Sequence, residues 1–106
     1  EKVIKQHRKL EDPYVWHNEK GFWLLCNKVG TEKGPAGLLF HSSDGIVWDP
    51  PVAGYPNPID FSGHRQRLEE PNLLFRDGKP THLFNIMGAC PEDPVYSGFV
   101  FAIEDL

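Results

Sequence analysis

The sequence is poor in cysteine. Its only two cysteines, Cys26 and Cys90, lie far apart and form no C-x-x-C pattern. Zinc sites and redox pairs need clustered cysteines, so neither is indicated. We expect two buried free thiols rather than a disulfide, because an unpaired cysteine behaves as a small hydrophobic residue.

The sequence also lacks an excess of positive charge and any long apolar run. It has 11 Lys and Arg residues against 15 Asp and Glu residues, which gives a net charge of −4 at pH 7. Binding to phosphates needs a basic surface, so no nucleic-acid partner is expected. No segment approaches the length of a membrane span and no charged-then-apolar leader opens the sequence, so no membrane partner is expected.

Glycine and proline, in contrast, are abundant. The chain has 106 residues, the size of one small domain, and 40% of them are hydrophobic, which is enough to form a core. Ten glycines and ten prolines divide the chain into short segments and exclude long helices. We therefore predict an all-β fold.

The chain contains an internal repeat. Residues 10–13, Leu-Glu-Asp-Pro, return as residues 68–71, Leu-Glu-Glu-Pro, and an apolar run follows each copy. Each run leads into a polar turn and a second apolar strand, and the turn of the second copy contains Asp-Gly, a strong hairpin signal. Residues 37–40 resemble residues 98–101 and predict a third strand in both copies. One repeat is therefore expected to be an antiparallel meander.

The repeat favours the blades of a β-propeller. An apolar run at residues 46–49 predicts a fourth strand in the first copy, and four antiparallel strands per repeat are typical of a blade. We predict one partial domain with a first blade at about residues 10–49, a proline-rich connecting loop at about 50–63 and an incomplete second blade at about 64–106. A solenoid of β-turns is the alternative. Because two blades cannot close a ring, we expect self-association or the missing blades of a longer chain.

Acidic residues stand directly before the proline that recurs in both copies of the repeat. These are Glu11 and Asp12 in the first copy and Glu69 and Glu70 in the second. The inner strand of a blade begins near the central channel, so the carboxylates of neighbouring blades are expected to converge there. Two carboxylates facing each other across a pocket are the minimum for glycoside hydrolysis. The alternative is that these acids bind backbone amides at the strand starts and have no chemical role.

Four short segments carry a family resemblance through their order and spacing. They are residues 11–16 (EDPYVW), 43–48 (SDGIVW), 67–71 (RLEEP) and 80–84 (PTHLF). Together they resemble the five-bladed β-propeller glycoside hydrolases of families 43 and 117, the arabinanase, β-xylosidase and neoagarooligosaccharide hydrolase relatives, over most of residues 10–103. The resemblance implies hydrolysis of oligosaccharides by a complete propeller, and a periplasmic or extracellular location.

The resemblance also implies roles for two acids. The family uses a base Asp in its first blade, an Asp in a D-P motif that orients and tunes, and often a Glu as the general acid. By position, Asp12 resembles the tuning Asp and Glu69 resembles the acid. No segment matches the base Asp, so the chain alone is not expected to hydrolyse a substrate. Asp12 and Glu69 are the candidate catalytic residues, and no metal or cofactor is expected.

Six further residues are expected to bind the substrate around these two acids. They are Tyr14, Trp16, His64, Arg65, Arg67 and Glu70. The aromatic rings can stack on a sugar, with packing inside the protein as the alternative. Arg65 and Arg67 would keep Glu69 ionised if they reach it. Adjacent side chains of a strand face opposite ways, so only one of Glu69 and Glu70 can point into the site.

Two classes of function fit this sequence. The first is a glycoside hydrolase-like propeller segment that acts on oligosaccharides when complete. The second is a non-catalytic carbohydrate-binding or assembly module, in which the acids and aromatic residues bind sugars without cleaving them. An inactive truncated gene product is a third reading.

Overall fold

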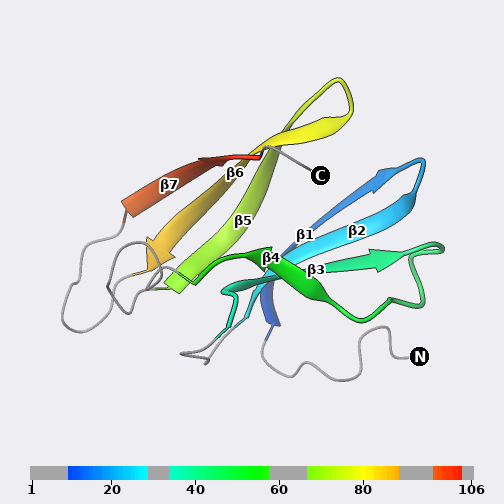
Figure 1. Cartoon of the computed structure of the whole chain (residues 1–106), viewed down its shortest axis with the longest axis horizontal. Helices are drawn as coiled ribbons and strands as arrows, with labels where there is room; N and C mark the ends of the chain where they lie inside the picture. The colour runs from blue at the N-terminus through cyan, green and yellow to red at the C-terminus, as the bar shows by residue number, and fades with distance from the viewer. Residues whose placement is uncertain (1–9, 29–33, 58–66, 89–96, 104–106) are drawn as a thin grey trace.

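The computed structural model describes residues 10–28, 34–57, 67–88 and 97–103, and all regular structure in these ranges is β. The strands are β1 Leu10–Asn18, β2 Gly21–Lys28, β3 Gly37–Ser42, β4 Val52–Tyr55, β5 Arg67–Arg76, β6 Lys79–Gly88 and β7 Ser97–Ala102. They form a four-stranded sheet, β1-β2-β3-β4, and a three-stranded sheet, β5-β6-β7, and every pairing is antiparallel (Figure 1). The predicted all-β fold of two antiparallel meanders is confirmed. No helix within the described ranges could cross a membrane.

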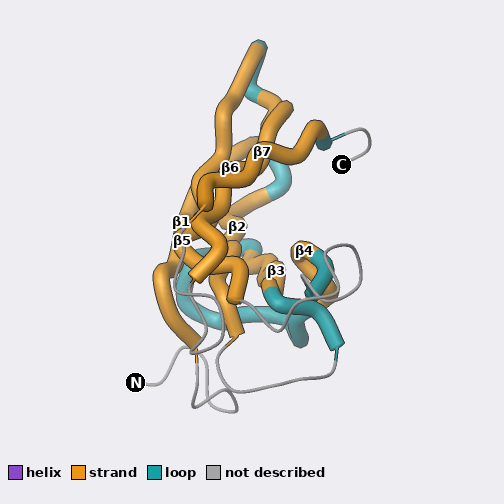
Figure 2. Tube along the Cα trace, turned by 90° about the vertical axis from the view of Figure 1, so that its left-hand side faces the viewer, coloured by secondary structure: helices purple, strands orange, loops and turns teal. Residues whose placement is uncertain are grey.

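The two sheets meet along their first strands. β1 and β5 lie side by side and begin at the same end of the molecule (Figures 1 and 2). The Tyr14 hydroxyl of β1 donates to the Leu73 carbonyl of β5 at 3.4 Å. The rings of Trp16 and Phe75 pack edge to face, with centroids 6.0 Å apart. The two copies of the repeat therefore start at one end of the fold.

Local turn chemistry sets the first hairpin of each sheet. Between β5 and β6, Asp77 and Gly78 have φ values of 50° and 74°, the positive values that a two-residue type I′ turn requires. This confirms the Asp-Gly hairpin predicted from the sequence. Between β1 and β2, the Asn18 side chain accepts the backbone amide of Lys20 at 2.9 Å, and Gly21 continues the chain with a φ of 116°.

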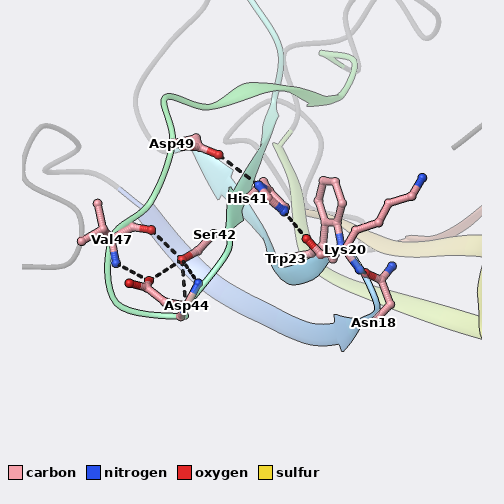
Figure 3. Close-up of polar contacts among 9 residues, drawn as sticks. Asn18, Lys20, Trp23, His41, Ser42, Asp44, Val47 and Asp49 are labelled. Carbon is pink, nitrogen blue, oxygen red and sulfur yellow. Dashed lines mark hydrogen bonds and ion pairs between the residues drawn. The ribbon is translucent and has the colours of Figure 1, made fainter.

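The prediction of the fourth strand was wrong. Residues 46–49 form no strand, and β4, Val52–Tyr55, lies inside the stretch that was expected to be a connecting loop. The Asp44 carboxylate accepts hydrogen bonds from the backbone amides of Ile46 and Val47 at 2.8 and 2.9 Å. Figure 3 shows the bond from Val47. Such side-chain bonds compete with strand formation, so the apolar run folds into a turn and pairing resumes later.

The third strands follow as predicted, but their alignment differs from the sequence match. Asn27 of β2 stands opposite Gly37, whereas Asn85 of β6 stands opposite Phe99. The sequence match had paired Gly37 with Gly98. The structural alignment is thus shifted by one residue from the sequence match, and such a shift moves a side chain to the other face of a sheet. Phe99 in the second copy therefore takes the place that Gly37 has in the first.

One hydrophobic core joins the two sheets and contains buried residues from both. Its members are Leu25, Tyr55, Leu68, Leu83 and Met87. Side chains alternate along a strand, so the neighbours of these residues face away from the shared core. Hydrophobic burial is thus the main force that holds one sheet against the other.

The outward faces of the two sheets differ. On the first sheet, Trp48 packs against a buried cluster formed by Cys26, Leu38 and Phe40. On the second sheet, four large apolar side chains of the outward face remain exposed. They are Leu74, Phe84, Ile86 and Val100. The self-association predicted from the sequence stays a prediction, and this exposed face is the surface on which it would act.

A glycine substitution tests the packing of β4 on β3. Gly37 lies beneath the Tyr55 ring, and an added Cβ would overlap that ring. We predict that Gly37→Ala lowers the free energy of unfolding by about 2 kcal/mol, because the ring must move. In Gly98→Ala the added Cβ meets no atom within 4 Å, and we expect a change below about 0.5 kcal/mol. Urea unfolding compares the two, and equal losses would contradict the packing.

His41 ties the β1–β2 hairpin to the segment that follows β3. Its Nδ1 lies 3.0 Å from Oδ2 of Asp49, and its Nε2 lies 2.6 Å from the carbonyl oxygen of Lys20 (Figure 3). Both partners are acceptors, so only the doubly protonated ring donates to both. The hydrogen bond to Asp49, followed by the one to Lys20, raises the pKa of His41 above its usual value.

This linkage predicts that stability falls as the pH rises. The pKa of His41 in the folded chain lies above the ordinary value of 6.5, so its contribution is complete below that pH and is lost as the pH rises through the folded-state pKa. Thermal melts between about pH 5.5 and pH 8.5 measure the slope. Asp49→Asn removes the carboxylate at nearly constant size and should flatten it. An unchanged slope in Asp49→Asn would contradict the linkage.

Candidate functional site

The two copies of the repeat share a strained backbone bulge. Asp12 and Glu70 each precede a proline and have φ values of 51° and 50°, which non-glycine residues rarely adopt. The strand register shifts at both places, as in a β-bulge. By position in the bulge, Asp12 corresponds to Glu70, and Glu11 corresponds to Glu69. The two candidate catalytic acids therefore occupy different positions of the repeat.

A buried asparagine on the second strand holds each bulge. Asn27 and Asn85 are 2% and 3% exposed. The Asn27 amide nitrogen donates to the Glu11 carbonyl at 2.9 Å and to Oδ2 of Asp12 at 3.0 Å, in the amide orientation that satisfies both contacts. The Asn85 nitrogen donates to the Glu69 carbonyl at 3.2 Å. Neither asparagine was predicted from the sequence, although a polar residue at the same place in two apolar strands was the signal.

Tyr55 links β4 of the first sheet to β5 of the second. It is 4% exposed, and its hydroxyl donates to the Leu68 carbonyl at 3.1 Å. Leu68 directly precedes Glu69, so the bond anchors the backbone beside a candidate catalytic acid. The sequence analysis missed Tyr55 because it lies in the stretch that was expected to be a loop.

Both candidate acids act on the Tyr55 hydroxyl. Burial is the main reason that the pKa of Tyr55 lies far above its usual range, and a hydrogen bond with Asn85 opposes the rise. The charges of Asp12 and Glu69 raise this pKa further. The charge of Cys26 raises this pKa as well. That they line one pocket stays a prediction.

Glu69 is less exposed to solvent than Glu70, and the sequence predicted that only one of the two points into the site. Its side chain is 19% exposed, and its Oε1 lies 2.8 Å from Nε of Arg67, whose side chain is 58% exposed. Glu70 is exposed at the bulge. The Glu69 carboxylate therefore accepts a charge-assisted hydrogen bond from an exposed arginine of the same strand.

The predicted aromatic binders pack between the sheets. Tyr14 and Trp16 are half-buried, and besides their contacts with β5, the rings of Trp16 and Trp23 stack with centroids 6.1 Å apart. Packing accounts for their placement, and their contact with a sugar stays a prediction. His64 and Arg65 lie outside the described residues.

Cys26 is a free, buried thiol, as predicted. It is 1% exposed, and its Sγ donates to the Leu38 carbonyl at 3.8 Å. Burial raises the pKa of this thiol to about 11, although the hydrogen bond to Leu38 opposes the rise. Cys90 lies outside the described residues. Across the described ranges, no three His, Cys, Asp or Glu side chains are grouped to hold a metal ion.

Comparison with protein-family models, curated proteins and solved structures finds no match to this chain. That Asp12 and Glu69 are catalytic residues stays a prediction.

Removal of the Tyr55 hydroxyl tests the link between the sheets. We predict that Tyr55→Phe lowers the free energy of unfolding by about 1–2 kcal/mol, because the Leu68 carbonyl loses a buried partner. Tyr14→Phe is the matched control. The Tyr14 hydroxyl makes a longer bond of 3.4 Å at a half-buried site, so its removal should lower the free energy of unfolding by less. Chemical denaturation measures both, and a larger loss in Tyr14→Phe would contradict the assignment.

Proposed function

We propose that this chain forms two adjacent blades of a β-propeller and contributes Asp12 and Glu69 to a glycoside hydrolase-type site for oligosaccharides. The observation that carries the proposal is the hydrogen bond from the buried Tyr55 hydroxyl to the Leu68 carbonyl, which ties the first sheet to β5 directly beside Glu69. The side-by-side placement of β1 and β5, which begin at the same end, supports it. So does the exposed apolar face of the second sheet, where a further blade packs in a complete ring.

The chemistry divides between the two acids. Glu69 protonates the oxygen of the leaving sugar once the Arg67 side chain moves away, and the exposed position of Arg67 makes this movement inexpensive. Asp12, held by Asn27, orients the reacting groups and adds negative charge beside the oxocarbenium-like transition state. The base that activates water comes from a further blade.

The second candidate function is binding of oligosaccharides without cleavage. The ion pair between Arg67 and Glu69 favours it, because a charged carboxylate accepts hydrogen bonds from sugar hydroxyls but gives no proton. The two functions share the same residues and differ in whether a further blade completes the set of acids.

Binding of oligosaccharides to the chain tests the proposed function. Arabinotriose, xylotriose and neoagarobiose are the probes, with calorimetry and ligand-observed NMR as the measurements. We expect one of the probes to bind without release of reducing sugar. Glu69→Gln should weaken that binding about tenfold, since it removes a charged acceptor.

Two controls make this test specific. Glu70→Gln changes the neighbouring exposed glutamate and should weaken binding less than Glu69→Gln does. Glu19→Gln makes the same charge change in the β1–β2 turn and should leave the affinity unchanged. The proposal fails if none of the three probes binds, or if Glu69→Gln binds as tightly as the natural chain.

A further inference from the structure

We propose that Asn27 is a positioning residue that fixes the direction of the Asp12 carboxylate, an inference that rests on the proposed function. The Asn27 amide carries two N–H donors, and the two oxygens that it faces use both. One bond goes to the Glu11 carbonyl and holds the bulge. The other goes to Oδ2 of Asp12 and holds the side chain.

The amide itself is held rigidly. Asn27 is 2% exposed. It lies on β2, between Glu11 of β1 and Gly37 of β3. Asp12 is confined as well, because its φ of 51° sits in a narrow allowed region and Pro13 follows it. A donor on a rigid strand can therefore set the direction of an otherwise exposed carboxylate.

The second copy of the repeat separates the bond that holds the bulge from the bond that holds a carboxylate. Asn85 makes the same bond to a backbone carbonyl, that of Glu69, at 3.2 Å. Within the described residues, its amide makes no bond to the side chain of Glu70, the counterpart of Asp12. Holding the bulge is therefore common to both asparagines, whereas holding a carboxylate belongs to Asn27 alone. Asn85→Leu is thus a control that loses the bond to the bulge and the contact with Tyr55, but no bond to the carboxylate that corresponds to Asp12.

A double-mutant cycle on the full chain tests the role. With the probe sugar that binds, Asn27→Leu should lower the affinity about fivefold. In the Asp12→Asn background the same substitution should change the affinity less than about twofold, because the partner side chain has already lost its charge. Asn85→Leu should give the same effect in both backgrounds. An undiminished loss for Asn27→Leu in the Asp12→Asn background overturns the proposal and assigns Asn27 a structural role alone.

A second measurement needs neither a bound sugar nor a folded Asn27→Leu variant. In the NMR spectrum of the full chain, Asp12→Asn should move the side-chain amide resonances of Asn27 and leave those of Asn85 in place. Unmoved Asn27 resonances overturn the positioning role even if the sugars bind. Moved Asn27 resonances together with no sugar binding confirm the contact and reject the proposed function, so the two failures are distinguishable.

Discussion

The arrangement of the two sheets depends on one tyrosine. Tyr55 stands on the edge strand of the first sheet, where its ring covers Gly37 and its hydroxyl reaches the Leu68 carbonyl of the second sheet. Apolar packing alone would let two sheet faces slide, since the hydrophobic effect has no direction. A buried hydroxyl that loses its partner costs about 1–3 kcal/mol, so this bond selects one relative position. That position keeps β1 beside β5.

Two of the three described non-glycine residues with positive φ lie in the first half of those strands, and the third, Asp77, lies in a hairpin turn. A non-glycine residue with positive φ costs about 1–3 kcal/mol, and Asp12 and Glu70 both have one. Each bulge is compensated by a buried asparagine amide that binds the backbone carbonyl before it. A sheet without a bulge would need neither the strain nor the buried polar group. Their recurrence makes the bulge a structural feature that both copies of the repeat share.

The sequence predicted the features that depend on local signals. The Asp-Gly turn determines its own hairpin, and two matching apolar segments around it predict the meander. The fourth strand was misplaced because the competing bonds of Asp44 depend on its side-chain geometry, which hydrophobicity does not report. Tyr55 was missed for a related reason: a short, proline-flanked segment shows no strand pattern, and its pairing with β3 relies on the absence of a side chain at Gly37.

The candidate site was predicted in part by the repeat and obscured in part by it. The acids before each proline mark the two bulges, but treating the two copies as equivalent hid how they differ. In the first copy a neutral, buried amide contacts the carboxylate of Asp12, whereas in the second an exposed guanidinium contacts that of Glu69. The first contact is rigid and the second opens easily. The proposed function gives Asp12 a fixed direction and Glu69 a proton transfer, and the two copies of the motif differ in the contacts that these two carboxylates make.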